Sequence, residues 1–229
     1  MNVRIGLLAS VALIAAAAGA AQAADLVIEE VAVAPVATDW SGPYVGAHIG
    51  VGGGQIGDQT SIITLLAVPG EDNRGYDLSG WLAGVQAGGY LQFGSFVLGL
   101  RGDVSWSNLS GPWTDDGDEY PGDTATIDWL ASLTARGGVA FDNVLLYGLA
   151  GLAMAGGSSD YYGDVQDLNF AGITLGVGAA LKLDENWSVF AEYAYSTFGD
   201  IDVYYPVDDF TATYDLDIST IKVGLNYSF

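Results

Sequence analysis

The sequence holds few side chains suited to nucleophilic or metal chemistry. Among 229 residues there is one histidine, His48, and no cysteine. The lack of cysteine excludes disulfides, thiolate nucleophiles and Cys-ligated zinc sites. A serine hydrolase needs a histidine beside its nucleophile, and no catalytic, nucleotide-binding or zinc motif accompanies His48. We therefore predict that the protein is not an enzyme and has no cofactor and no metal site.

Acidic residues dominate the charge. The chain has 28 Asp and Glu against 6 Lys and Arg, which gives a formal net charge of −22. Proteins bind nucleic acids through clustered basic residues, so we expect no nucleic-acid partner. The stretch DDGDE at 115–119 brings carboxylates together, but it lacks the glycine and terminal glutamate positions of an EF-hand loop. We interpret the acids as a solvated, repulsive outer surface, with capture of divalent cations as the alternative.

The elements that carry the remaining charges alternate with a period of two. In 96–106 one face is apolar, and the other holds polar residues or glycine. A half-buried strand alternates in this way, whereas a helix repeats near 3.6 residues. Eight segments show the pattern, near 42–52, 80–93, 96–107, 126–141, 144–155, 170–183, 187–197 and 214–229.

The connections between these segments are alternately long and short. Three are tight turns, at Gly94-Ser95, Asp142-Asn143 and Asp184-Glu185-Asn186, and four are long, at 53–79, 108–125, 156–169 and 198–213. Short turns at one end and long loops at the other are typical of outer-membrane barrels. The polar face is rich in Gly, Ser and Thr, which suits a narrow lumen better than a solvated surface. We therefore predict an all-β fold, a transmembrane antiparallel up-and-down β-barrel of eight strands spanning 40–229, closed by pairing of its first and last strands.

Charged and aromatic residues are sorted along these strands. The candidate lumen charge network is Arg101, Asp103, Asp128, Arg136, Lys182, Glu192 and Lys222. The candidate aromatic girdles are Phe93, Phe96, Phe141, Trp187 and Phe229 beside the short turns, and Trp81, Trp106, Trp129, Tyr195 and Tyr214 beside the long loops. Two such belts mark the two membrane interfaces. The ten steps from Phe96 to Trp106 span about 25 Å at ~3.3 Å per residue and ~40° tilt, the height of an apolar band.

The first residues predict export from the cytoplasm. Arg4, an apolar stretch at 5–18 and Ala21-Gln22-Ala23 form the three parts of a secretory signal peptide, so we expect cleavage after residue 23. An uncleaved anchor is the alternative. Residues 24–39 show neither the two-residue period of a strand nor the 3.6-residue period of a helix, and we expect them to be a flexible linker.

From Trp40 the chain resembles the alphaproteobacterial outer-membrane immunogenic proteins, a porin-like family of eight-stranded barrels. The matching stretches are DWSGPYVGAHIG (39–50), GWLAGVQAGGY (80–90), GLRGDVSW (99–106), GVAFDNVLLYGLAGLA (138–153), ENWSVFAEYAYSTFGD (185–200) and IKVGLNYSF (221–229). The resemblance implies an outer-membrane location, a surface-exposed role and passive diffusion of small solutes. It also implies that Tyr227 and Phe229 form the signal read by the barrel-assembly machinery.

Two positions depart from the family pattern. The family usually carries Glu where this chain has Arg101, and Arg where it has Thr134. We expect Arg101 to pair with a different inward acid. Some relatives are reported to bind haem, which we do not carry over to a chain with one histidine and no cysteine.

The sequence thus predicts a structural, surface-exposed outer-membrane protein with at most weak passive permeability. The expected partners are outer-membrane lipid, lipopolysaccharide and the barrel-assembly machinery, with a host or envelope partner that the loops do not identify. The lumen charges are expected to form a plug, and a thin charge-lined water path is the alternative. An adhesin acting through acidic loops is the alternative function. A small lipid-modifying enzyme with His48 as base is a second alternative.

Overall fold

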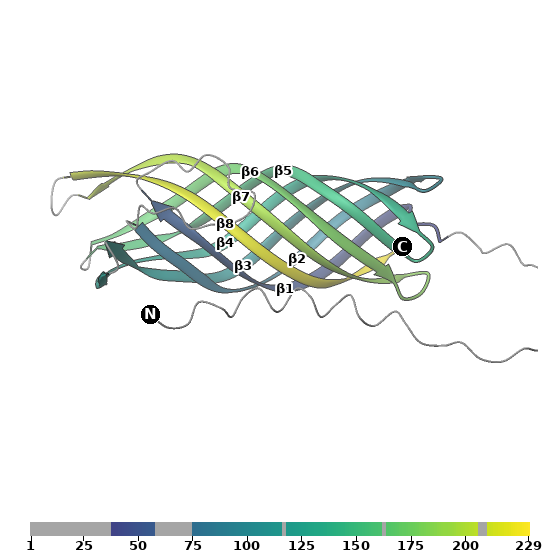
Figure 1. Cartoon of the computed structure of the whole chain (residues 1–229), viewed down its shortest axis with the longest axis horizontal. Coiled ribbons are helices and arrows are strands. Elements are labelled where there is room, and N and C mark those ends of the chain that lie inside the picture. The colour runs from purple at the N-terminus through teal and green to yellow at the C-terminus, as the bar shows by residue number, and fades with distance from the viewer. Residues whose placement is uncertain (1–37, 58–74, 116–117, 162–163, 206–209) are drawn as a thin grey trace, which may run out of the picture. The chain divides into compact units, whose positions relative to one another are not determined.

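The barrel is built from eight long strands. The computed structural model describes residues 38–57, 75–115, 118–161, 164–205 and 210–229, so the predicted signal peptide and most of the predicted linker lie outside the described residues. The strands are β1 (Gly42–Gly57), β2 (Gly75–Phe93), β3 (Phe96–Asp115), β4 (Asp118–Phe141), β5 (Val144–Tyr161), β6 (Asp164–Lys182), β7 (Trp187–Tyr205) and β8 (Phe210–Ser228) (Figure 1). Within the described residues no helix is long and apolar enough to cross a membrane.

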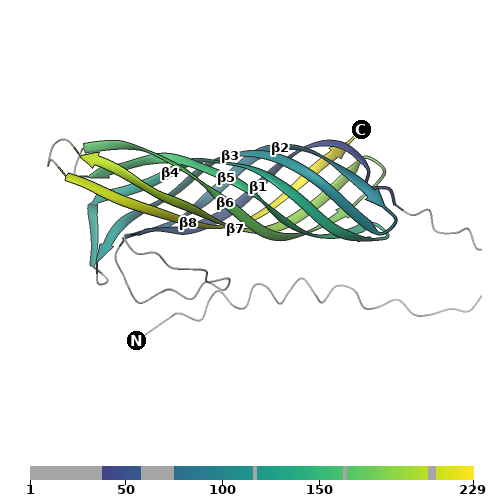
Figure 2. The ribbon, with the colours of Figure 1, turned by 90° about the horizontal axis from the view of Figure 1, so that it is seen from above.

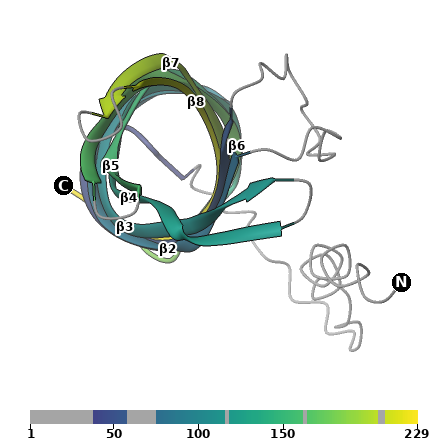
Figure 3. The same ribbon diagram turned by 90° about the vertical axis from the view of Figure 1, so that its left-hand side faces the viewer.

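The sheet closes on itself in strand order. Each strand pairs antiparallel with the next, and β1 pairs with β8 from Tyr44↔Ser228 to Gly57↔Asp215. Viewed along the barrel, the strands form a complete ring (Figure 3). The predicted eight-stranded, closed, up-and-down topology is therefore confirmed. Closure leaves the strands without free edges over the segment that lipid would surround, as an apolar solvent requires.

The tight turns lie where the sequence predicts them. Gly94 and Asp142 both adopt positive φ, +63° and +51°. Glycine tolerates this conformation without strain, and Asp is one of the few other residues that do so readily. The third turn connects β6 and β7 between Lys182 and Trp187, and the three turns lie together at one end of the barrel (Figure 2).

The predicted long connections are wrong in three of four cases. Most of 108–125, 156–169 and 198–213 continues the flanking strands, with only 116–117, 162–163 and 206–209 between them. In 108–114 and 123–127 the strands alternate, but apolar side chains such as Leu109 and Ile127 face inward, which interrupts the pattern that defines the predicted segments. The fourth connection is shorter than predicted, because β1 continues to Gly57 and β2 begins at Gly75. Residues 58–74 lie outside the described part of the chain.

The aromatic belts divide the barrel into two parts. We call the strand segments between the two belts the embedded part, and the strand ends beyond Trp81, Trp106 and Trp129 the distal extension. In the embedded part of β3, Leu100 is 62% exposed on the outside and Arg101 is 2% exposed on the inside. In the distal extension Leu109 is completely buried and Ser110 is exposed.

Two apolar clusters occupy the barrel interior. The proximal cluster lies toward the tight turns and comprises Trp40, Tyr44, Tyr90, Val97, Ala140, Leu145, Tyr147, Leu149, Ala180, Phe190 and Ala194. The distal cluster comprises Ile56, Tyr76, Leu78, Leu82, Leu109, Ala125, Ile127, Leu130, Ala153, Ala155, Leu168, Phe170, Phe198, Leu216 and Ile218, with Trp113 packed against it. The sequence predicts a polar lumen, and in the structure the polar section lies between two apolar ones.

One seam of the wall is shorter than its neighbours. In the described part of the chain the β6–β7 ladder runs from Lys182↔Ser188 to Gly172↔Phe198 and continues no further. The β5–β6 ladder continues to Tyr161↔Asp164, and β7–β8 continues to Tyr205↔Phe210. Beyond Phe198, on the side away from the tight turns, β6 and β7 therefore belong to two separately hydrogen-bonded groups of strands.

Candidate functional site in the barrel interior

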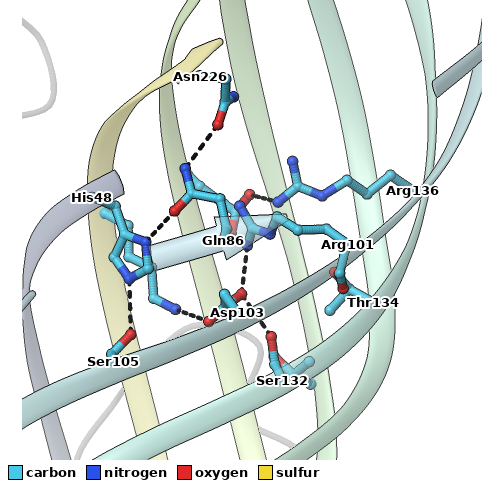
Figure 4. Close-up of polar contacts among 12 residues, drawn as sticks. His48, Gln86, Arg101, Asp103, Ser105, Ser132, Thr134, Arg136 and Asn226 are labelled. Atoms are coloured by element: carbon cyan, nitrogen blue, oxygen red, sulfur yellow. Dashed lines mark hydrogen bonds and ion pairs between the residues drawn. The ribbon is translucent and has the colours of Figure 1, made fainter. Parts of the chain in front are cut away.

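Five charged side chains from four strands meet in the middle of the barrel. The Arg101 Nη2 atom lies 2.5 Å from Glu192 Oε1 and 3.1 Å from Asp103 Oδ1. Lys222 Nζ lies 3.0 Å from Asp103 Oδ2, and Arg136 Nη2 pairs with Glu192 Oε2. Figure 4 shows part of this arrangement around Arg101 and Asp103. The sequence brings them together because all five occupy inward positions, and Glu192 faces Lys222 directly across the β7–β8 ladder.

Neutral groups add hydrogen bonds to these charges, and the Nε atoms of Arg101 and Arg136 are left buried without a partner in the described chain. Ser132 Oγ donates to Asp103 Oδ1 at 2.8 Å, and the Tyr147 hydroxyl donates to Glu192 Oε2 at 3.0 Å. Arg136 Nη1 donates to the Tyr90 hydroxyl at 3.1 Å. The Arg136 guanidinium also lies 4.7 Å from the centre of the Tyr147 ring, within cation–π range. Buried charges are tolerated when they are paired and hydrogen-bonded in this way, so the network ties four strands together.

A second, uncharged chain of hydrogen bonds includes His48. Its Nδ1 lies 2.5 Å from Gln86 Oε1 and its Nε2 lies 2.8 Å from Ser105 Oγ. Gln86 Nε2 donates to Asn226 Oδ1 at 2.8 Å, which leaves Gln86 Oε1 as an acceptor. His48 Nδ1 therefore donates and Nε2 accepts the Ser105 hydroxyl proton. The chain connects β1, β2, β3 and β8 (Figure 4).

Ser105 donates its hydroxyl proton to His48 as the serine of a hydrolase dyad does, but the groups around this pair differ from those of a hydrolase. Gln86 occupies the place of the acid that orients a catalytic histidine and stabilises its cation. Ser105 is completely buried, and the cavity described below is not lined by Ser105 or His48. The arrangement can therefore hold four strands in register.

Two predicted members of the charge network lie elsewhere. Asp128 is exposed on the outside, because it is the extra residue of a bulge between Ile127 and Trp129. On one side of this bulge the buried positions of β4 are 123, 125 and 127, and on the other they are 130, 134 and 136. Counting by twos from Arg136 places Asp128 inside, and the bulge overturns that count.

Lys182 lies at the mouth of the barrel rather than in the network. Its Nζ donates to the backbone carbonyls of Asp39 at 2.5 Å and of Glu185 at 3.3 Å. It also lies 5.7 Å from the centre of the Trp40 ring. Lys182 therefore helps to hold the residues that precede β1 against the tight-turn end of the barrel.

The interior leaves little free space beside the network. A cavity of about 30 Å³ lies between the charges and the distal cluster, lined among others by Arg101, Thr134, Thr174, Phe198 and Thr220. This volume holds one or two water molecules. On the proximal side, Tyr44 stacks on Tyr90 at 5.0 Å, and Trp40 meets the same ring edge-on at 6.4 Å.

The aromatic residues chosen from the sequence lie mainly on the outside. Exposed members are Trp81, Phe93, Phe96, Trp106, Phe141, Trp187 and Phe229. Trp129 and Tyr195 are half-buried, and the side chain of Tyr214 lies outside the described residues. Trp129 is covered because its indole lies over Gly156, where a Cβ atom would come within 2.4 Å of Nε1. Tyr227 and Phe229, the expected assembly signal, pack edge to face at 5.3 Å.

Sequence reasoning missed the aromatic part of the interior. Trp40, Tyr44, Tyr90 and Tyr147 fill the proximal lumen, and the hydroxyls of Tyr90 and Tyr147 are hydrogen-bond partners of the charges. Their inward positions follow from the same alternation that places Arg101 and Arg136. The available signal was therefore the register of each tyrosine relative to an inward charge on its own or a neighbouring strand.

Comparison with known proteins assigns this architecture to a family. The outer membrane protein beta-barrel domain family matches residues 9–229. The chain belongs to this family. Its relatives include the 31 kDa outer-membrane immunogenic protein of Brucella melitensis, 32% identical over 97% of this chain and 98% of that protein. A 22 kDa outer membrane protein of Rhizobium leguminosarum is 31% identical over 88% of this chain and 83% of that protein.

The family assignment fixes the location of the barrel. Members of the immunogenic group are outer-membrane proteins by name, so this outer membrane protein beta-barrel domain resides in the outer membrane. Among solved structures, the outer membrane protein OprG from Pseudomonas aeruginosa has a TM-score of 0.51 at 10% identity, covering 82% of this chain and 96% of that one. This similarity concerns the fold alone, and it agrees with the closed eight-stranded topology.

Proposed function

We propose that the protein is a non-conducting structural barrel that displays its distal extension on the cell surface. The observation that carries this proposal is the filled interior. The charge network lies between the proximal and distal clusters, with a cavity of only about 30 Å³ beside it. A hydrated ion needs a continuous path, and side chains such as Leu109 and Ile127 are completely buried in the distal cluster.

The energetics of the interior favour a plug over a gated pore. Opening a path would separate Arg101 and Arg136 from Glu192, and uncompensated buried charges cost several kcal/mol each. An eight-stranded barrel has an interior just wide enough for its own side chains. Passive diffusion is therefore expected to be absent or very weak, and the charges act as a brace between strands.

Planar-bilayer recording tests this function. The mature chain 24–229 is refolded, and heat-modifiable gel migration verifies that the barrel is intact. We expect no discrete conductance steps from the wild type. A Leu109→Ala, Ile127→Ala double variant removes two side chains of the distal cluster. It tests whether a path through the barrel interior can be opened. Discrete openings in the wild type whose ion preference changes in Lys222→Ala would contradict the proposal and identify a small charge-lined pore.

The outer face of the distal extension is the candidate surface for binding a partner outside the cell. Exposed acids there include Asp77, Asp128, Asp160 and Asp167, on strands that continue the wall of the barrel. An acidic surface favours adhesion to basic partners through charge complementarity. Binding of a poly-lysine-coated surface by intact vesicles should fall in an Asp77→Asn, Asp167→Asn variant. Equal binding by both proteins would remove the support for an adhesin.

The remaining partners follow from the membrane location. Outer-membrane lipid contacts the apolar wall, lipopolysaccharide surrounds the exposed end, and the barrel-assembly machinery reads the strand that ends at Phe229.

A further inference from the structure

The charges enclosed in the embedded part of the barrel do not balance. Among the described residues, three cations and two carboxylates meet there, which leaves a net charge of +1. They are Arg101, Arg136 and Lys222 against Asp103 and Glu192. His48 adds no charge, because its Nδ1 donates and its Nε2 accepts a hydrogen bond. An uncompensated charge inside an apolar wall is costly, so this interior favours the binding of an anion.

The other buried carboxyl of the described chain does not supply the missing negative charge. Asp123 lies in the distal extension, where it accepts a hydrogen bond from Tyr76. It is nine residues along β4 from Ser132, which contacts Asp103 in the network. At ~3.3 Å per residue this separation is about 30 Å, so Asp123 does not neutralise the network by contact.

The cavity of about 30 Å³ lies directly beside the unbalanced charges, since Arg101 and Lys222 both line it. One row of cross-strand partners crosses β4, β5, β6 and β7 at this level. Its members are Thr134, Gly151, Thr174 and Ser196. Gly151 brings no side chain into the row and its neighbours carry short hydroxyl side chains, which leaves the space open.

The charged groups that line the cavity have donors to spare and no spare carboxylate oxygen. Both oxygens of Asp103 and both oxygens of Glu192 already pair with Arg or Lys. Lys222 Nζ carries three protons, and its hydrogen-bond partner in the described chain is Asp103 Oδ2 at 3.0 Å. Arg101 is 2% exposed, and its Nε is buried without a partner in the same part of the chain.

The threonine hydroxyls of the row are only weakly engaged. Thr134 lies beside Arg101 (Figure 4), and its Oγ1 donates to the Arg101 carbonyl oxygen at 3.4 Å. Thr174 Oγ1 donates to the Tyr195 carbonyl oxygen at 3.3 Å. A good O–H···O bond has a length of about 2.7–2.8 Å, so both hydroxyls can turn toward a better acceptor.

We propose that this cavity binds one monatomic anion, chloride, between Arg101, Lys222 and the hydroxyls that line it. The ion neutralises the enclosed charge of +1 and accepts the N–H and O–H groups that are available. The volume holds one or two water molecules, so a monatomic ion fits there and phosphate or sulfate does not. The ion is enclosed when the barrel folds and is not conducted, so the site goes beyond the proposed structural role without requiring an open lumen.

The chloride dependence of unfolding tests the site. The mature chain 24–229 is refolded in phospholipid vesicles and unfolded with urea at constant ionic strength, while gluconate, which is too large for the cavity, is replaced by chloride. One ion bound only by the folded state lowers the unfolding equilibrium constant about tenfold for each tenfold increase in chloride above its Kd. We expect this slope for the wild type.

Three variants locate the ion, and heat-modifiable gel migration verifies the fold of each. Lys222→Met removes the excess positive charge and should abolish the chloride dependence, whatever its effect on stability itself. Thr220→Val removes a hydroxyl that lines the cavity at nearly constant volume. We expect it to weaken chloride binding about tenfold, the loss of one hydrogen bond to a charged group. Thr197→Val, at an exposed position on the outer face of β7, is the control and should keep the wild-type slope.

Crystals of the wild type grown with bromide in place of chloride give a second, direct measurement. We expect an anomalous bromide peak in the cavity beside Lys222. Unfolding that does not change when chloride replaces gluconate would overturn the proposal and assign the cavity to water. A chloride dependence that Lys222→Met retains, equal slopes and affinities in Thr220→Val and Thr197→Val, or bromide found only outside the cavity would also overturn it.

Discussion

The embedded part and the distal extension of the barrel are opposite in polarity, although the same strands form both. In the embedded part of β3, Leu100 faces outward and Arg101 faces inward. Ten residues later Ser110 faces outward and Leu109 faces inward. A barrel in water hides its apolar side chains inside, whereas a barrel in lipid exposes them. The surrounding solvent, and not the barrel itself, therefore decides which face of a strand is apolar.

Three of the four register shifts in the described ladders lie near the border between the two parts, and the fourth lies farther out, between Pro112 and Trp113. Register shifts occur between Trp106 and Leu109, between Ile127 and Trp129, and between Phe198 and Ile201. At Asp128 the shift exchanges the inward and outward positions of β4. Bulges bend and re-aim a strand, so they are suited to the point where the wall leaves the lipid.

The largest expected effect comes from breaking the charged interior of the embedded part. Glu192→Ala leaves Arg101 and Arg136 without their shared carboxylate. We expect the free energy of unfolding to fall by about 3–5 kcal/mol, because breaking a buried pair strands the remaining charges. Urea titration of the barrel in phospholipid vesicles measures it. Glu185→Ala, at an exposed turn, is the control, and equal stability of the two variants would rule out a bracing role.

An effect of intermediate size on the free energy of unfolding should distinguish the outer face of β3 in the embedded part from its outer face in the distal extension. Leu100→Lys places a charge on the lipid side of β3 in the middle of the embedded part, where Lys costs about 2–4 kcal/mol. Ser110→Lys makes the same addition on the same strand in the distal extension, where we expect a change within about 0.5 kcal/mol. The same unfolding titration compares them. Similar losses at both positions would mean that the border between lipid and water lies beyond Ser110.

The smallest expected effect is a pH dependence confined to the distal extension. Asp123 lies on β4 beyond the membrane-spanning part, and burial raises the pKa of its carboxyl above the usual 3.8, while the hydrogen bond from Tyr76 opposes this rise and nearby Asp160 adds to it. A raised pKa in the folded state means that the folded protein holds the proton more tightly. Its contribution to stability is therefore complete below pH 3.8 and is lost as the pH rises through the folded-state pKa.

The difference in unfolding free energy between the wild type and Asp123→Asn measures this contribution. It should favour the wild type most at low pH and decline as the pH increases. Asp167→Asn, which removes an exposed carboxylate from the same extension, is the control for net charge. A difference that grows with pH would have the wrong sign and would contradict burial as the dominant cause.

The sequence predicts the closed barrel and its tight turns because alternation and turn residues are local signals. Arg101, Asp103, Arg136, Glu192 and Lys222 could be placed inside by counting along regular strands, and they meet there. Asp128 could not, because a bulge is a tertiary adjustment that leaves no mark in a period-two count.

The sequence pattern does not reveal the full strand lengths, for a related reason. Where apolar residues pass from the outer face to the inner face, the alternation changes phase, and a single-phase pattern ends at the border. Lys182 shows a third limit. Its inward position was predicted, but its partners depend on the residues before β1, where Asp39 accepts its hydrogen bond and Trp40 presents its ring.

The short β6–β7 seam gives the distal extension a weak line. Beyond Gly172↔Phe198 no ladder in the described chain joins β6 to β7, whereas Phe170 and Phe198 meet there with ring centres 6.2 Å apart. Opening along this line breaks no ladder hydrogen bond that the structure describes between β6 and β7 beyond Phe198, and local opening follows the least costly route. Such opening would expose the backbone edges of both strands, with the embedded part still intact beneath them.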